Sequence, residues 1–231
     1  MKIVFILVEP AVPENVGAAA RAIKTMGFSD LILVNPCDYL CDKALMLAHG
    51  SNEILRNAKV FSSLKEALSD IDFSIATSAK QRWVKQNIIQ STEIKHFIRE
   101  KEDIIESLAI VFGGEESGLS NEDIALCDRV AAIPLAEPYP SLNLSQAVMV
   151  FAYSLTSISS EAVIKERGVE NHGYKQLKHK VDRILNEVEI TEKSLVYGRI
   201  MERLTEISSE DVNLLHSLCS KIIERLDSEH D

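Results

Sequence analysis

The chain has 231 residues, of which 46% are hydrophobic and 26% are charged, a composition typical of one globular domain with an appendage or of two small domains. Its formal net charge of −10 argues against a passive nucleic-acid coat, because such proteins are basic. It does not exclude an enzyme that reaches RNA through a few well-placed Lys and Arg side chains.

Short apolar runs alternate with helix-like stretches through the first two thirds of the chain. The runs are mostly continuous and rich in Ile, Val and Phe, which is typical of parallel strands buried on both faces. The predicted strands are 2–8, 31–34, 59–61, 71–77, 108–112 and 129–133. The predicted helices are 15–26, 43–48, 63–69, 92–106 and 120–127. Ser62 or Ser63 marks one helix start, and Ser120 with Asp123 has capping-box spacing. The alternation predicts an α/β fold with an open parallel sheet.

The pattern changes after Pro140, where one long apolar helix begins and no further strand follows. Residues 160–231 have apolar positions three to four apart and are predicted to be helical throughout, with a linker near Gly168 to Gly173. We therefore expect an α/β domain over 1–159 and a small all-helical extension over 160–231. The basic stretch at 175–183 is interpreted as a solvated helix face.

No segment predicts a membrane span, because the apolar run at the N-terminus ends at Glu9 and lacks the flanks of a signal peptide. Cys37 and Cys41 are not followed by a second pair of ligands at zinc spacing, so no metal site is expected. With Cys127 and Cys219 they are predicted to be reduced thiols of a cytoplasmic protein.

Four distinctive stretches follow predicted strands, at 9–17, 77–83, 113–123 and 134–147. In open α/β sheets, ligands bind outside the carboxyl ends of the strands. The convergence of these stretches on one sheet edge is the main functional signal in the sequence.

The first stretch leads into an alanine-rich helix that contains Asn15, Gly17 and Arg21. Asn15 is predicted to cap this helix, and Gly17 with the alanines after it predicts close packing by another segment. Arg21 lies one turn beyond Gly17, so its guanidinium could extend over the space that Gly17 leaves open. A surface arginine on a packed helix is the alternative. A Rossmann site is not supported, because the chain has no G-x-G-x-x-G.

The third stretch carries three glycines, Gly113, Gly114 and Gly118, around the carboxylates of Glu115 and Glu116. Glycine permits positive φ and a close approach of the backbone to a ligand. No Gly-Lys-Ser/Thr closes the loop, so it is not a P-loop. A tight loop with solvated acids is the alternative interpretation.

The fourth stretch is stiffened by Pro134, Pro138 and Pro140. Ser141 and Asn143 follow at the start of the long apolar helix. Helix capping explains one of these two residues, and their joint presence after a rigid loop favours a site.

Taken in order, "NVGAAARA…MGF", "VFGGEESGLSNE" and "IPLAEPYPSLNLSQAVMVFAY" resemble the three motifs of the SpoU-type branch of the SPOUT RNA methyltransferases. The resemblance covers essentially the whole chain and is nearest to the TrmJ/LasT-like group, whose members carry a helical C-terminal extension. It implies a deep trefoil knot in the C-terminal part of the α/β domain, S-adenosylmethionine (S-adenosyl-L-methionine) bound there, and a homodimer. The implied reaction is methyl transfer to a ribose 2′-hydroxyl of RNA, with tRNA favoured over rRNA.

The resemblance also implies a set of site residues. The catalytic set is Asn15, Arg21, Glu115, Ser141 and Asn143. The cofactor-binding set is Thr77, Ser78, Ala79, Gly113, Gly118, Ile133, Leu135, Ser141 and Leu142. Basic residues around the first and fourth strand ends partly offset the overall acidity: Arg21, Lys24, Lys80, Arg82 and Lys85. Trp83 among them could stack on a splayed base, and packing within the protein is the alternative. A non-catalytic RNA-binding protein of the same fold and a SPOUT enzyme that methylates a base remain the alternatives.

Overall fold

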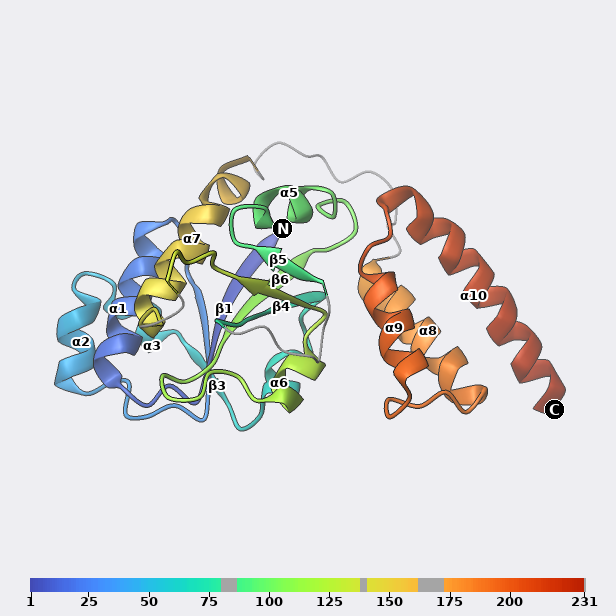
Figure 1. Cartoon of the computed structure of the whole chain (residues 1–231), viewed down its shortest axis with the longest axis horizontal. Helices are drawn as coiled ribbons and strands as arrows, with labels where there is room; N and C mark the ends of the chain where they lie inside the picture. Colours follow the sequence, from blue (N-terminus) through green and yellow to red (C-terminus); the bar gives the residue numbers. More distant parts are fainter. Residues whose placement is uncertain (80–86, 138–140, 162–172, 231) are drawn as a thin grey trace.

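The computed structural model describes residues 1–79, 87–137, 141–161 and 173–230 (Figure 1). A sheet of seven parallel strands has the order β3-β2-β1-β6-β4-β7-β5. The strands are β1 (Lys2–Val8), β2 (Asp30–Val34), β3 (Lys59–Phe61), β4 (Phe73–Thr77), β5 (Ile88–Gln90), β6 (Ser107–Phe112) and β7 (Arg129–Ala132). The predicted α/β fold class with a parallel sheet is confirmed.

Helices cover both faces of the sheet. They are α1 (Pro13–Thr25), α2 (Asp42–Ala48), α3 (Asn52–Arg56), α4 (Leu64–Ala67), α5 (Ile94–Arg99), α6 (Asn121–Leu126) and α7 (Leu144–Glu161). Along β1, Phe5 and Leu7 pack into the core under α1, α2 and α7, while Val4 and Ile6 pack into the core under α4 and α6. Figure 1 shows α1, α2, α3 and α7 grouped together on one side of the sheet. Successive side chains of a strand point to opposite faces, so a strand between two helical layers is apolar throughout.

Two elements differ from the sequence prediction. The edge strand β5 was not predicted from the sequence; it is a three-residue strand defined by its pairing with β7. The predicted helix over 92–106 is shorter, since α5 ends at Arg99 and turns lead into β6. The predicted starts at Ser63 and Ser120 are confirmed: both side chains accept a backbone amide at N3, and Asp123 completes a capping box.

The four distinctive stretches belong to neighbouring strands. They follow β1, β4, β6 and β7, which lie in the order β1-β6-β4-β7 at the middle of the sheet. The connections after β4 and β7 include undescribed residues, so the trefoil knot stays a prediction. Within the described ranges, no helix is both long and apolar enough to cross a lipid bilayer.

The C-terminal part consists of α8 (Tyr174–Glu187), α9 (Leu195–Leu204) and α10 (Ser209–His230). It docks against the amino ends of the strands, away from the carboxyl edge. The ring of Tyr174 lies 5.3 Å from that of Phe73, between centroids, and its backbone amide donates to the Ile104 carbonyl at 3.0 Å. Lys178 forms an ion pair with Asp128, which directly precedes β7. The division of the chain into 1–159 and 160–231 stays a prediction, and its boundary falls inside the last turn of α7.

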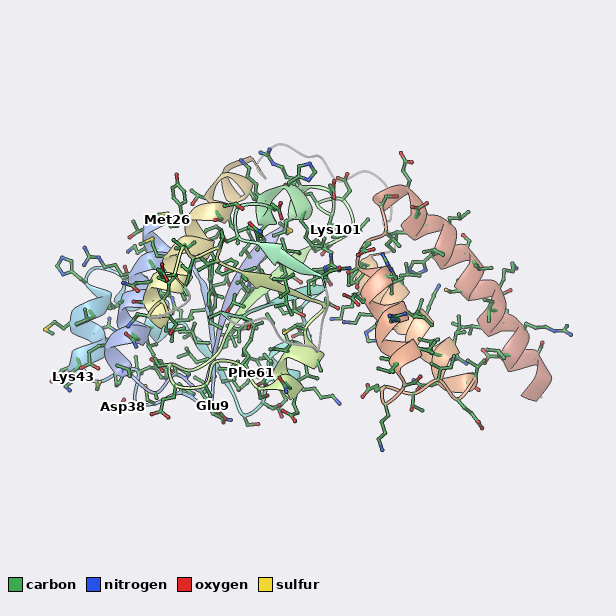
Figure 2. The ribbon with its side chains drawn as sticks, in the orientation of Figure 1. Glu9, Met26, Asp38, Lys43, Phe61 and Lys101 are labelled. Carbon is green, nitrogen blue, oxygen red and sulfur yellow. The ribbon has the colours of Figure 1, made fainter. Side chains whose placement is uncertain are left out.

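A polar cluster completes this contact. Lys101, which is labelled in Figure 2, is only 2% exposed. It donates to the Ile207 carbonyl at 3.2 Å and lies over the Phe97 ring. Burial lowers the pKa of Lys101. The Arg129 guanidinium also lies over Phe97 and pairs with Glu206 at 3.4 Å. These contacts join the two parts of the chain through desolvated charges.

The basic stretch 175–183 differs from its interpretation as a solvated face. Lys175 and Lys178 donate to groups of the α/β domain, and Lys180 and Arg183 donate to groups on α10. These cations therefore contribute to holding α8 between the sheet and α10.

Candidate active site

Two strand-end stretches meet at the carboxylate of Glu115, and a third is linked to it through Asn15. Glu115 accepts hydrogen bonds from the backbone amides of Ala11 and Val12 at 2.9 and 3.3 Å, and from Asn15 Nδ2 at 2.8 Å. Asn143 Nδ2 in turn donates to Asn15 Oδ1 at 2.8 Å. Loops that follow β1, β6 and β7 are thus joined by one chain of hydrogen bonds, and three of its five residues, Asn15, Glu115 and Asn143, are predicted site residues.

The helix start differs from the prediction. α1 begins at Pro13 with Val12 as its N-cap, so Asn15 is the third helical residue and does not cap the helix. Proline is favoured at the first helical position, because its missing N–H would have no partner there and its φ is already helical. The side chain of Asn15 is therefore available to Glu115 and Asn143.

The space at Gly17 is also used differently. A Cβ atom at Gly17 would lie 2.1 Å from the Ala44 carbonyl oxygen, so the glycine admits the backbone of α2. The predicted close packing is confirmed, whereas the predicted open space beside Arg21 is wrong. Arg21 lies exposed on α1 and forms no hydrogen bond or ion pair with another described residue. Its guanidinium thus faces solvent on the same helix that carries Asn15.

The glycine loop packs against the protein's own backbone. A Cβ at Gly113 would lie 2.1 Å from the Gly118 carbonyl carbon, and one at Gly114 would lie 2.6 Å from the Glu9 carbonyl oxygen. Gly118 has φ +66°, as predicted for a glycine in this loop. The glycines at 113 and 114 are needed because the loop folds onto itself and onto the end of β1, which sets the position of Glu115.

Asn143 contacts the start of α7 in addition to its contact with Asn15. Its Oδ1 accepts from the backbone amide and the hydroxyl of Ser145, both at 2.8 Å, and the backbone N–H of Asn143 donates to Gln146 Oε1 at 3.0 Å. The predicted capping role is confirmed for Asn143, and Ser141 lies exposed two residues earlier. Because both sides of the Asn143 side chain are engaged, its orientation is determined by α7.

The predicted cofactor residues lie along the carboxyl ends of β4, β6 and β7. Thr77 donates its hydroxyl to the Val111 carbonyl at 2.9 Å, and the Ser78 amide donates to the Ala131 carbonyl at 3.0 Å. The remaining members of the set are half-buried or exposed: Ala79, Gly113, Gly118, Ile133, Leu135, Ser141 and Leu142. An adenosyl group needs apolar side chains together with backbone donors and acceptors. Ile133 and Leu135, which follow β7, and Leu142, which lies just before α7, are partly accessible apolar side chains of the kind that this requirement names.

Two functional groups were missed by the sequence prediction. The amides of Ala11 and Val12 bind Glu115 but carry no side-chain signal; the flanking Pro10 and Pro13 were the available indication of a rigid turn.

Burial raises the pKa of Cys37, and the nearby Glu115 carboxylate adds to the effect. None of the four cysteines, all of which lie in the described ranges, forms a disulfide bond.

Some predicted residues lie outside the described part of the chain. They are Lys80, Arg82, Trp83, Lys85, Pro138 and Pro140. Lys24 is described, and it pairs with Glu53 and donates to the Gly50 carbonyl.

Glycine-rich and proline-rich loops and the side-chain amides of Asn15 and Asn143 gather at the carboxyl edge of a parallel sheet. This arrangement is typical of the class of α/β proteins that bind a ligand at the ends of their strands. Residues 2–153 match the family described as SpoU rRNA Methylase, and residues 171–226 match the C-terminal domain of the tRNA/rRNA methyltransferase LasT. The chain therefore belongs to the SpoU methylase family.

Individual relatives support this assignment. An uncharacterized tRNA/rRNA methyltransferase LasT from Escherichia coli K12 is 38% identical over 222 residues, which is 96% of this chain and 97% of that protein. The tRNA (cytidine-2′-O-)-methyltransferase TrmJ of Methanocaldococcus jannaschii is 40% identical over 153 residues, 65% of each chain. The crystal structure of TrmJ from Z. mobilis ZM4 superposes with a TM-score of 0.69 at 27% identity, covering 96% of this chain and 99% of that one.

Proposed function

We propose that this protein transfers the methyl group of S-adenosylmethionine to a ribose 2′-hydroxyl of tRNA. The observation that carries the proposal is the hydrogen-bond chain from Glu115 through Asn15 to Asn143, with Arg21 exposed on the same helix. The family supplies the reaction class, and the TrmJ relatives, which are named as tRNA 2′-O-methyltransferases, supply the acceptor.

When bound, S-adenosylmethionine would supply an electrophilic methyl group to ribose O2′; the electron pair of the broken sulfur–carbon bond would stay on the sulfur, and the hydroxyl proton would pass to solvent water. Most of the catalysis in such an in-line displacement can come from positioning. The loops that begin at Thr77, Gly113 and Ile133 would hold the cofactor, and the Asn15–Glu115–Asn143 network would keep the loops after β6 and β7 in register with the start of α1.

Arg21 would act on the acceptor. Its guanidinium stays protonated in proteins, so it is suited to bind a phosphate of the RNA and to stabilise charge that develops on O2′. A role as general base is disfavoured for the same reason. We further propose that the working unit is a homodimer. Tyr153 is 73% exposed on α7, which packs on α1, so a large aromatic residue beside the site-bearing helix is available to contact a second copy of the chain.

The test is transfer of labelled methyl groups to total tRNA and, separately, to rRNA, with nucleoside mass analysis of the products. Arg21→Ala is expected to reduce transfer to tRNA at least ten-fold while calorimetry gives unchanged cofactor binding. Arg56→Ala on α3, which also removes an exposed arginine, is the matched control and should keep full activity. Methylated bases, or cofactor binding without transfer to either RNA, would contradict the proposal.

A further inference from the structure

The outermost helix, α10, has one face that is covered and one that is not. Its inner face is buried against α8: Val212 is 1% exposed and Cys219 is 7% exposed. Lys180 on α8 contacts His216 Nδ1 at 2.9 Å and donates to Ser220 Oγ at 2.6 Å. These contacts fix the rotation of α10 about its own axis, and they therefore determine which of its side chains point away from α8.

The outer face carries an apolar stripe. Leu214, Leu218 and Ile222 are 70%, 55% and 36% exposed and recur every four residues, which places them on one side of the helix. In Figure 1, α10 is the helix farthest from α1 and α2 and has no other described element on its outer side. An ordered row of exposed large side chains on a soluble helix marks an interaction surface.

Charged residues flank this stripe with opposite signs. Asp211 lies three residues before Leu214, and Arg225 lies three residues after Ile222. Both are on the same side of the helix as the stripe and both are exposed. Read in the reverse direction, the face has the same apolar pattern with its charges exchanged, which is the property of a self-complementary surface.

We propose that α10 pairs with α10 of a second copy of this chain, in antiparallel orientation about a two-fold axis at Leu218. Leu218 then faces its own counterpart, Leu214 faces the partner's Ile222, and Asp211 faces the partner's Arg225. Because a two-fold contact is isologous, each unlike pair is formed twice. A parallel pair would instead bring Asp211 against Asp211 and Arg225 against Arg225, so the charges select the antiparallel arrangement.

This interface is separate from the dimer proposed above. α10 belongs to the part of the chain that docks on the amino ends of the strands, whereas α1 and α7 carry the site at the carboxyl ends. A pair of helices buries less than the roughly 1,600 Å² of a standard interface, so we expect the association to be weak and dependent on protein concentration. It would join catalytic units without depending on their activity.

The test is sedimentation velocity over a wide range of protein concentrations. Leu218→Asp is expected to weaken the concentration-dependent association at least a hundred-fold, because it places two carboxylates on the two-fold axis. Met46→Asp on α2 is the matched control: it changes a side chain that is 69% exposed on another element and should associate like the unmodified protein. Equal association of Leu218→Asp and the unmodified chain would overturn the proposal, as would the lack of any concentration-dependent step.

Charge exchange tests the orientation. Asp211→Arg alone and Arg225→Asp alone are each expected to weaken association on the order of ten-fold, since each creates two like-charge contacts. The double exchange should restore it, although it keeps any local cost of losing the acid in the first turn of α10. Far-UV circular dichroism and melting temperatures establish that every variant is folded. Failure of the double variant to recover would rule out the antiparallel pair.

A cysteine on the axis gives a second measurement. Under mild oxidation, Leu218→Cys is expected to form a covalent dimer through its own counterpart, whereas Ser217→Cys, also exposed but off the stripe, should not. The unmodified protein measures the background from its four cysteines. Equal cross-linking of the two variants would mean that Leu218 does not face itself.

Discussion

The amide of Asn15 bridges Glu115 and Asn143: its Nδ2 donates to the carboxylate at 2.8 Å and its Oδ1 accepts from Asn143 at 2.8 Å. One short side chain therefore fixes the relative positions of two residues that reach it from different strands. Removal of either partner leaves a hydrogen-bonding group without its counterpart, so the network should fail as a unit.

Glu115→Gln should lower the kcat/KM of methyl transfer at least ten-fold. The carboxylate accepts from three N–H groups, whereas a glutamine side chain has one acceptor oxygen and turns its NH₂ toward a donor. A hydrogen bond to a charged group contributes about 1.5–3 kcal/mol, which is enough for a loss of that size. Glu116→Gln, on the exposed neighbour, is the control. Equal activity of the two variants would show that the Glu115 charge is unimportant.

Gly17→Ala should destabilise the fold by about 1–3 kcal/mol, because the new methyl group would meet the Ala44 carbonyl on α2. Gly198→Ala is the opposite case: nothing lies within 4 Å of its Cβ position, and it is inside α9. That change should stabilise by up to about 1 kcal/mol through helix propensity. Urea unfolding measures both, and a loss of stability in Gly198→Ala would contradict the assignment of α9.

Asp128→Ala should destabilise the chain by about 3 kcal/mol or more. The buried carboxylate accepts from the Ser74 amide and hydroxyl at 2.9 Å and pairs with Lys178, so its removal leaves desolvated groups unmatched. Asp227→Ala removes the partner of Arg183 in an exposed pair and should cost less than about 1 kcal/mol. Denaturant unfolding of both variants tests the difference, which would be absent if the Asp128 contacts contributed little.

The lowered pKa of Glu206 predicts that the free energy of unfolding decreases at acidic pH. Its hydrogen bond from Arg203 holds its pKa below the ordinary value of 4.5, and Arg129 adds to the effect. The carboxylate of Glu206 binds a proton less tightly in the folded state than in the unfolded state. Its contribution to the free energy of unfolding is therefore complete above pH 4.5, and it is lost as the pH falls below 4.5 and through the lowered pKa.

Melting temperatures measured against pH test this expectation. Glu206→Gln should melt below the unmodified protein at pH 7, and the difference should narrow below pH 4.5. Glu210→Gln, on α10 and also exposed, is the control. A difference that stays constant down to pH 3 would mean that the charge of Glu206 is not involved.

The sequence by itself determined the class of fold and the segments that carry the site. Continuous apolar runs separated by amphipathic stretches are local signals of burial, and they predicted six of the seven strands. The motifs that contain Asn15, Arg21, Glu115 and Asn143 were likewise recognised as short patterns, as was a capping role for either Ser141 or Asn143.

The tertiary structure alone decided what these segments touch. Whether β6 lies beside β1, and whether Gly17 faces α2 or open space, depends on pairing between residues far apart in the chain. Local periodicity carries no information about such pairing. The strand β5 and the bond from Asn143 to Asn15 both arise from contacts between distant segments, because each is stabilised by a partner that the neighbouring residues do not specify.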